Sequence, residues 1–394
     1  MGADLSRLKV LASGVFCLIL TMGIARFSYT PMMPIMFDQT ALSKVLAGWL
    51  ATINYAGYML GSLTAMLVSN LIIKDRIYRL GLILAIVTTF MMGLSEEPWV
   101  WAVSRFVAGF STASGILIGS GLMLSWLITH NHRSEMGIHF SGIGLGISGA
   151  ALLLWFSESL SWSQQWLAMG LLGVFLAIPA WRWLPPPDVS GANTSGKLLK
   201  DNPPSKRFLK LMIWAYFCAG FGFVISATYI VAIVESQPAM EGKGELAFLI
   251  LGLCAAPACI IWDLISRKVG ILNALLLVYA IHALGIVLPT LNDTLLFALL
   301  SAGLYGFTFV GIVSIVLTMA GRFYPTKPAK LMGLLTISYG VPQIIAPTIA
   351  GYLAEISGNY NAALYMASGF VILGFFTILV IKKYAGQDID KLER

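Results

Sequence analysis

Long apolar runs separated by short polar stretches recur along the whole 394-residue chain. A helix that crosses a bilayer needs about 20 mostly apolar residues. Because backbone groups in lipid must be hydrogen-bonded within the segment, such runs favour helices, and the short alternating segments of a membrane barrel are absent. The pattern therefore predicts twelve transmembrane helices. Their approximate bounds are residues 10–36, 45–69, 78–95, 99–127, 135–157, 164–183, 211–234, 246–262, 270–289, 294–320, 330–354 and 361–381.

One polar stretch divides the chain into two parts. Residues 185–209 are rich in Pro, Gly, Ser and Lys, and they separate six apolar runs from six. When the two parts are aligned at an offset of 196 or 197 residues, similar residues coincide, as Gly23 does with Gly220. This repetition predicts two parallel repeats related by an axis along the membrane normal. We therefore expect an all-α membrane protein with two six-helix pseudo-symmetric halves, over residues 1–184 and 210–394, joined by a linker.

The basic residues are distributed unevenly between the predicted loops. Only Lys44 and Lys243 fall on the side opposite the termini, whereas the other Lys and Arg residues of the loops fall on the side of the termini. Loops on the cytoplasmic side of a membrane carry an excess of Lys and Arg, so both termini and residues 185–209 are expected in the cytoplasm. This asymmetry accounts for the net charge of +7, which therefore gives no argument for a nucleic-acid partner.

Enzymatic chemistry has no support in the sequence. The four cysteines all fall inside predicted spans and form no CxxC pattern or Cys/His cluster. No nucleophile is paired with a base, and no metal-ligand cluster or phosphate-binding loop occurs in a supporting context. We expect a protein that is not an enzyme and that holds no metal or cofactor.

Five segments carry a resemblance to a known family. They are GIARFSYTPMMPIM at residues 23–36, RFVAGFSTASG at 105–115, HFSGIGLGISG at 139–149, WDLISRKVG at 262–270 and YGVPQIIAPTIAGYL at 339–353. Together with the twelve-helix pattern, they make the chain similar to the major facilitator superfamily, and specifically to its YbfB/YjiJ branch. The resemblance implies a multi-pass secondary transporter of a bacterial inner membrane, whose two halves rock around a central site.

The resemblance also implies residues that act in gating. Asp263, Arg267 and Lys268 match the family motif that joins the second and third helices of a half on the side of the termini. In the first half, Asn70 stands where the acid of that motif belongs. This departure predicts that the two halves are gated differently on that side.

Two arginines lie within predicted spans. At a rise of 1.5 Å per residue, Arg26 lies about 24 Å from the start of helix 1 and Arg105 about 9 Å from the start of helix 4, so both belong to the outer half of the bilayer. No Asp or Glu lies near mid-membrane. A buried guanidinium needs an anion, carbonyl groups or water, and an anionic substrate would supply the opposite charge. The alternative is that helix-end carbonyls satisfy the arginines or that they snorkel to the surface.

Further substrate contacts are predicted from helix faces and from the helices that line the central cavity in the family. Met22 and Tyr29 share a face of helix 1 with Arg26, and Thr112 shares one with Arg105. The other candidates are Asn54 and Tyr58 in helix 2 and Tyr216, Phe223, Tyr305, Tyr339 and Gln343 in helices 7, 10 and 11. The positions equivalent to Arg26 and Arg105 in the second half are apolar or neutral, so an aromatic wall would face the positive charge. Packing is the alternative role of these aromatic residues.

Other titratable groups are candidates for gating and coupling. Asp38 and Glu235 occupy equivalent ends of helices 1 and 7 and would act at the outer mouth, although solvated helix-end acids are the commoner case. His139, near the start of helix 5, could carry a proton. Proton coupling and its direction are left open.

Three functional hypotheses follow. The first is alternating-access transport of a small organic anion, with the two halves rocking about a midplane site. The second is efflux of amphipathic drugs through a cavity lined by aromatic and Met residues. The third, from another class, is a membrane sensor or scaffold that transports nothing. We expect a monomer whose partners are a small-molecule substrate and the lipid bilayer.

Overall fold

The structure is a computed structural model that describes residues 2–190, 198–235 and 243–393, apart from a few side chains within these ranges. Part of the predicted linker, residues 191–197, lies outside the described residues, and so do residues 236–242. Almost all of the described chain is helical.

The first half contains six helical rods, two of which are built from three parts. The first rod consists of α1 (Gly2–Leu18), the π-helical segment η1 (Ile19–Phe27) and α2 (Tyr29–Gln39). The next two are α3 (Lys44–Leu67) and α4 (Leu71–Leu94). The fourth consists of α5 (Pro98–Ala113), π-helical η2 (Ser114–Gly119) and α6 (Ser120–Thr129). The last two are α7 (Met136–Phe156) and α8 (Trp162–Arg182).

The second half contains six long helices and a short terminal one. It begins with α9 (Lys206–Glu235), α10 (Gly244–Val269) and α11 (Ile271–Val287), which ends in a 3-10 turn, η3 (Leu288–Thr290). It continues with α12 (Leu295–Phe323), α13 (Ala329–Ser357) and α14 (Asn361–Ala385). The short helix α15 (Gln387–Glu393) follows.

The described helices confirm the predicted membrane architecture. Eleven rods within the described ranges are long and apolar enough to cross a membrane. The twelfth rod, α3, is 24 residues long, but Asn54, Tyr55 and Tyr58 lower its hydropathy. These polar side chains are tolerated because α3 turns them toward other helices, as the burial of Asn54 and Tyr58 shows.

Several helices, among them α4 and α10, extend further than the apolar runs predicted. α4 begins at Leu71 instead of residue 78, and α10 ends at Val269 instead of residue 262. Asp263, Arg267 and Lys268 therefore lie inside the last turns of α10 and not in a loop after it. The apolar pattern stops where the charges begin, but the helix continues, since Asp263 and Arg267 form an ion pair four residues apart.

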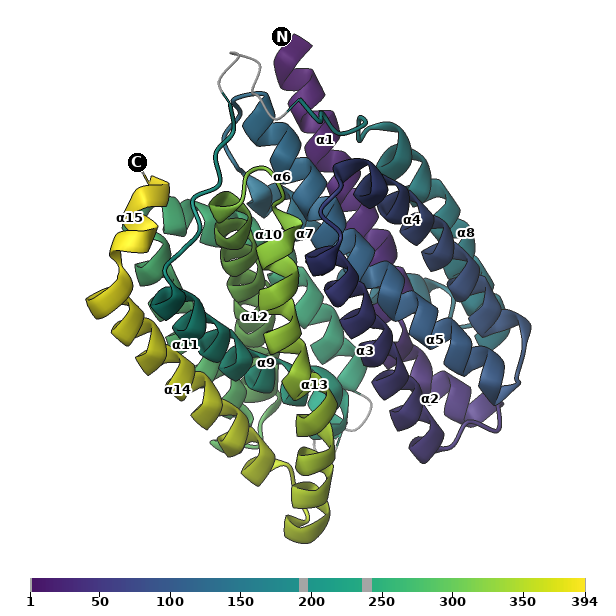
Figure 1. The fold of residues 1–394 in the computed structure, drawn as a ribbon. Coiled ribbons are helices and arrows are strands. Elements are labelled where there is room, and N and C mark those ends of the chain that lie inside the picture. Colours follow the sequence, from purple (N-terminus) through teal and green to yellow (C-terminus); the bar gives the residue numbers. More distant parts are fainter. Residues whose placement is uncertain (1, 191–197, 236–242, 394) are drawn as a thin grey trace.

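The two halves lie side by side, and both ends of the chain lie at the same end of the bundle (Figure 1). We call this end the terminal face and the other end the opposite face. The terminal face is the one that the basic residues predict to be cytoplasmic. Figure 1 also shows α7 next to α10 and α3 next to α13, so these four helices join the halves.

Backbones of the two halves approach closely along α7 and α10. A Cβ atom added to Gly144 would lie 2.1 Å from the backbone nitrogen of Ala256, and one added to Gly252 would lie 2.7 Å from that of Ser148. On the other side, a Cβ on Gly333 of α13 would lie 2.7 Å from the carbonyl oxygen of Ser62. Small residues at these positions allow helices to pack in direct contact.

Candidate functional site

The candidate site is built on the π-helical part of the first rod. In a π-helix each amide bonds to the carbonyl five residues back, as Ser28 N does to Gly23 O at 2.9 Å. Pro31 lacks the N–H that would reach back to the carbonyl of Arg26 or Phe27. Arg105 of α5 donates instead, from Nη1 to the Ala25 carbonyl at 3.0 Å and from Nη2 to the Arg26 carbonyl at 3.4 Å. Arg105 thus bonds to the main chain near the end of η1, within a few residues of Pro31.

Arg105 is therefore satisfied largely by backbone carbonyls, as the alternative interpretation of the sequence proposed. Its guanidinium also lies over the ring of Tyr29, with 4.4 Å between the guanidinium carbon and the ring centre. The Nε of Arg105 is buried and has no hydrogen-bond partner in the described part of the chain. The sequence indicated the depth of Arg105 but could not identify these partners, because they belong to the main chain.

Arg26 lies between the two halves. Its Nη2 donates to the Oε1 of Gln343 in α13, on the other half, at 3.0 Å. Aromatic rings surround the guanidinium, with that of Tyr58 4.4 Å and that of Tyr55 5.1 Å from it. Only 6% of Arg26 and 2% of Gln343 is exposed, so in this state the site is closed around a neutral partner.

The charges of this cluster are not balanced within the described residues. There, neither Arg26 nor Arg105 has a carboxylate within 4.0 Å, and the ion pairs of the chain all lie elsewhere. The guanidinium of Arg105 lies beside the backbone of Arg26, because it donates to the carbonyl of that residue. Uncompensated charge at membrane depth is expensive and is typical of substrate or ion pathways.

The second half supplies an aromatic wall. Tyr216 and Tyr339 stack with 4.6 Å between ring centres, and Phe223 lies 5.4 Å from Tyr339. The hydroxyl of Tyr305 in α12 donates to the carbonyl of Phe223 in α9 at 2.7 Å. This hydrogen bond from a side chain of α12 to a backbone carbonyl of α9 is similar to the bond that Arg105 of α5 makes to the carbonyl of Arg26, but its donor is neutral. The Nε2 of Gln343 donates to the carbonyl of Tyr339 at 3.3 Å, which joins the wall to Arg26.

Three of the other predicted contacts bond helices of the first half together. The Nδ2 of Asn54 donates to the carbonyl of Arg105 at 2.8 Å, and the hydroxyl of Thr112 donates to the carbonyl of Thr21 at 2.9 Å. The hydroxyl of Tyr29 donates to the carbonyl of Ala47 at 3.2 Å. Met22 is buried. These side chains hold the first, second and fourth rods around the two arginines.

The predicted gate residues form an ion-pair network at the terminal face. In α10, the Nη2 of Arg267 lies 2.8 Å from the Oδ2 of Asp263. The Nη1 of the same arginine lies 3.8 Å from the Oε1 of Glu135, which directly precedes α7 in the first half. Glu135 also forms an ion pair with Arg7. Lys268 is exposed. The sequence interpretation missed Glu135, although its place before a helix that faces the other half was the available signal.

The proposed outer gate has one described member. Asp38 is exposed and lines a cavity of about 520 Å³ on the opposite face, together with Glu158, Lys243 and residues of α7 and α10. This cavity lies between the halves. Glu235 ends α9, but its side chain lies outside the described residues, so its predicted role is not addressed.

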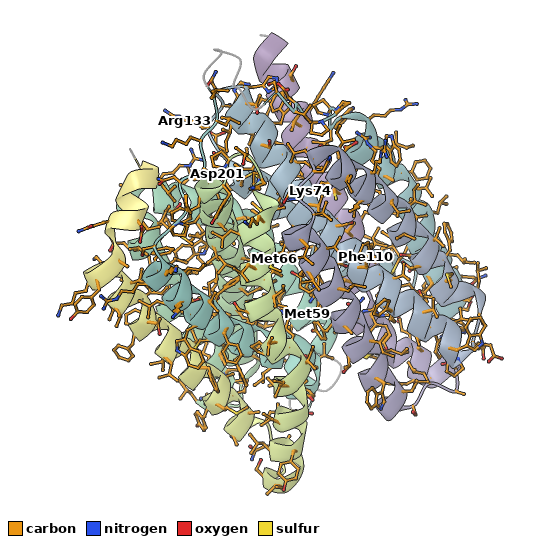
Figure 2. All side chains as sticks on the ribbon, in the orientation of Figure 1. Met59, Met66, Lys74, Phe110, Arg133 and Asp201 are labelled. Atoms are coloured by element: carbon orange, nitrogen blue, oxygen red, sulfur yellow. The ribbon has the colours of Figure 1, made fainter. Side chains whose placement is uncertain are left out.

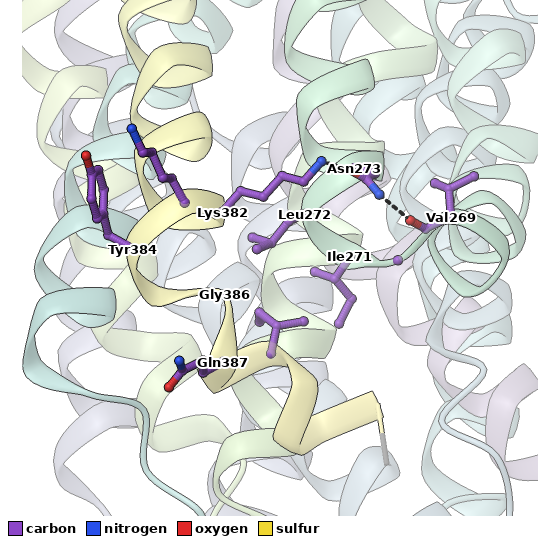
Figure 3. Close-up of a pocket in the computed structure, with 11 residues that line it drawn as sticks. Val269, Ile271, Leu272, Asn273, Lys382, Tyr384, Gly386 and Gln387 are labelled. Carbon is purple, nitrogen blue, oxygen red and sulfur yellow. Dashed lines mark hydrogen bonds between the residues drawn. The ribbon is translucent and has the colours of Figure 1, made fainter.

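A second large cavity lies within the second half. It has a volume of about 400 Å³ and is lined by α11 and by the segment that joins α14 to α15 (Figure 3). Lys382 donates to the Oδ1 of Asn273 there at 2.7 Å. Because all of its lining residues belong to one half, this cavity is not on a path between the halves.

Comparisons with known proteins agree with the architecture. A family model described as "Uncharacterised MFS-type transporter YbfB" matches residues 18–379. The chain is 25% identical to the uncharacterized MFS-type transporter YceJ of Bacillus subtilis (strain 168), over 91% of this chain and 87% of YceJ. It is 20% identical to the probable sulfoacetate transporter SauU of Cupriavidus necator, over 75% of each chain.

Solved structures share the fold. The human organic anion transporter MFSD10 superposes with a TM-score of 0.70 at 16% sequence identity, over 95% of this chain and 98% of that one. The nucleoside transporter NupG superposes with a TM-score of 0.64 at 14% identity, over the same shares of the chains. Because the family model spans most of the sequence and the helices adopt the fold of these transporters, the chain belongs to the YbfB-like family of major facilitator superfamily transporters.

Proposed function

We propose that this transporter moves a small organic anion by alternating access, with Arg26 as the residue that binds the anion. The observation that carries the proposal is a buried guanidinium between the two halves that donates to a neutral side chain, Gln343, and has no carboxylate within 4.0 Å among the described residues. A carboxylate or sulfonate would offer the planar fork of arginine two charged acceptors in place of one amide oxygen.

The contact between Arg26 and Gln343 also suggests how binding would act on the halves. In this state the two side chains form a bridge from the first rod to α13. An anion that takes the donors of Arg26 would replace this bridge by contacts of its own, and a ligand shifts an equilibrium only when it binds the two conformations differently. The aromatic wall would exclude water around the anion, which strengthens the charged interaction.

Names among the compared proteins support an anion as substrate. SauU is named as a probable sulfoacetate transporter and MFSD10 as an organic anion transporter. The first aligns with this chain over three quarters of its length, and the second shares its fold. Transport of anions is thus represented both among its relatives and among its structural neighbours.

The test is binding of a panel of organic acids to purified protein, measured by thermal shift and then by uptake into proteoliposomes. We expect Arg26→Gln to fold and to lose binding of the anion that stabilises the parent protein, because glutamine keeps hydrogen-bonding capacity without charge. The loss should be about 2–5 kcal/mol in binding free energy. Arg26→Lys should bind weakly, since an ammonium lacks the two-pronged fork.

A second variant separates charge from packing. Gln343→Glu keeps the side-chain length and adds a carboxylate 3.0 Å from the guanidinium, so it should occupy Arg26 permanently and block the anion without removing the arginine. Unchanged affinity of an identified anion in both Arg26→Gln and Gln343→Glu would make Arg26 structural. Retained transport of lipophilic cations in Arg26→Gln would instead favour drug efflux.

A further inference from the structure

The two halves carry the same charged motif in different forms at the terminal face. In α10, Asp263 is followed four residues later by Arg267, and the two form an ion pair at 2.8 Å. In α4, Asn70 holds the place of the acid, and Lys74 follows it four residues later. The Oδ1 of Asn70 accepts the backbone N–H groups of Ile72 and Ile73. Asn70 therefore caps the helix and offers no charge to Lys74.

Lys74 is buried, and the described residues offer its ammonium no hydrogen-bond partner. Only 1% of it is exposed, and its Nζ is among the buried polar atoms that lack such a partner there. The adjacent acid, Asp75, pairs instead with Arg79 at 2.9 Å. An ammonium has three donors and, when buried, is stabilised only by acceptors or opposite charge. Lys74 thus holds the place of Arg267 in the motif, but without the acid with which Arg267 pairs.

A second positive charge and a cavity lie near Lys74. Lys327 of the other half lies in the loop before α13, directly after Thr326, and adds a second positive charge to this region. A cavity of about 470 Å³ lies beside this place, lined by Asn70, one helical turn from Lys74, and by Thr326, next to Lys327. Ser125 and Thr129 of α6 contribute hydroxyls to its lining. Figure 2 shows Lys74 near the terminal face, where the two halves meet.

Two acids border this cavity, since Asp188 is part of its lining and Asp201 binds Thr326 of that lining. Asp201 accepts from the N–H and hydroxyl of Thr326, at 3.1 and 2.8 Å. Asp188 lies at the exposed rim, where the N–H of Ser190 donates to it and keeps the pKa of its carboxyl below the ordinary value. Neither forms an ion pair with Lys74 or Lys327, within the 4.0 Å that defines one, in the described structure.

We propose that Lys74 and Lys327 form a binding site for an oxyanion, a phosphate or a carboxylate, between the two halves at the terminal face. The anion enters the cavity beside Asn70, and the flexible stem of Lys74 turns its ammonium toward it. The bound anion supplies the negative charge that Asp263 supplies in the second half and that Asn70 lacks in the first. Because it joins a cation of each half, its binding stabilises the state in which the terminal face is closed.

The experiment is a thermal-shift titration of the purified full chain with inorganic phosphate and with sulfate at constant ionic strength. A ligand that binds the folded state raises its stability by mass action, so we expect a saturable rise in melting temperature of about 2 °C or more. Lys74→Gln should abolish the rise. Lys330→Gln, which removes an exposed positive charge from the first turn of α13, three residues after Lys327, should keep it.

Asn70→Asp tests the same site without removing the lysine. Aspartate caps a helix as well as asparagine does and restores the acid of the motif, so the variant should fold, melt higher than the parent without added anion, and respond no further to phosphate. Arg26→Gln should keep the full phosphate response, which separates this site from the proposed substrate site.

Vesicle experiments distinguish the source of the oxyanion. If phosphate in detergent has no effect, but phosphatidylglycerol vesicles raise the melting temperature over phosphatidylcholine vesicles in the parent and not in Lys74→Gln, the ligand is a lipid headgroup. A phosphate response in detergent identifies a free oxyanion. The proposal is overturned if Lys74→Gln and Asn70→Asp respond to phosphate and to phosphatidylglycerol as the parent protein does.

Discussion

Arg26 and Arg105 are neighbours with different kinds of partner. Arg105 bonds to two main-chain carbonyls of the first rod, whereas Arg26 bonds to a side chain of the other half. A hydrogen bond to a backbone carbonyl holds a helix in place in every state of the cycle, but a bond across the halves can be exchanged. We infer that Arg105 positions the first rod and that Arg26 meets the substrate.

This division predicts different losses on substitution. Arg105→Met should lower the free energy of unfolding by about 2–4 kcal/mol, because it removes the two buried, charge-assisted hydrogen bonds that the carbonyls of Ala25 and Arg26 accept. Arg26→Gln should change it far less. Denaturant unfolding of both variants in the same detergent measures the difference, and Arg105→Lys should recover part of the loss. Equal stability of Arg105→Met and the parent protein would contradict the positioning role.

At the scale of helices, the two halves are joined where the backbones of their helices pack in direct contact. Gly144 of α7 packs directly on the backbone of α10, which cannot move aside as a flexible side chain would. Gly149, one and a half turns further along the same helix, has no atom within 4 Å of an added Cβ. The two glycines therefore serve as test and control in one helix.

We expect Gly144→Ala to lower the melting temperature and to widen the distance between α7 and α10, because the added methyl would lie 2.1 Å from the nitrogen of Ala256. Gly149→Ala should be neutral or stabilising, since alanine is the better helix former by about 0.8–1 kcal/mol. Thermal unfolding and spin-label distances between the halves give the comparison. If Gly144→Ala melted at the same temperature as Gly149→Ala, α7 and α10 would be able to move apart at Gly144 without loss of stability. This result would contradict the prediction.

The sequence predicted the helices well and their internal register poorly. Twelve apolar runs correspond to twelve rods, because transfer of apolar residues to lipid decides which segments cross. The π-helical turns η1 and η2 leave no trace in hydropathy, since they change hydrogen-bond register and not composition. Pro31 was the one hint. Likewise, the sequence placed Arg26 and Arg105 at one depth, but only the fold shows that Gln343 faces the first and carbonyls the second.

At the scale of the whole molecule, ion pairs hold the halves together at the terminal face, where they join α7 to α10 through Glu135 and Arg267. A cavity of about 470 Å³ beside Asn70 also lies between the halves at this face, and the cavity of about 520 Å³ lies between them at the other end. If the terminal face is cytoplasmic, the ion-pair network lies on the cytoplasmic side and the larger of the two cavities on the outer side.

Labelling tests that orientation. In a chain whose four buried or half-buried cysteines are replaced, Lys44→Cys should react with a membrane-impermeant maleimide on intact cells, and Lys200→Cys should react only after the cells are opened. The expectation follows from the excess of basic residues on the side of the termini. The reverse pattern would invert the membrane orientation and exchange the inner and outer mouths.

The last prediction concerns the gate at the terminal face. When the halves rock apart, Arg267 keeps Asp263, because both belong to α10, but it must leave Glu135 of the first half. Glu135→Gln should therefore favour the state that is open at the terminal face. The pair is partly exposed, so its loss should change the ratio of open to closed molecules about two- to five-fold. Asp263→Asn should give a weaker shift in the same direction, by loosening the arginine that Glu135 contacts.

Spin-label distances across the terminal face measure this ratio. Asp75→Asn is the matched control, since Asp75 pairs with Arg79 within α4 and joins no helix of the other half; it should leave the distances unchanged. High salt should shift the parent protein toward the Glu135→Gln distribution, because partly exposed ion pairs are screened. If Glu135→Gln keeps the parent distribution at low salt, the network serves only to anchor α7 and α10, and close packing at Gly144 and Gly333 alone holds the terminal face shut.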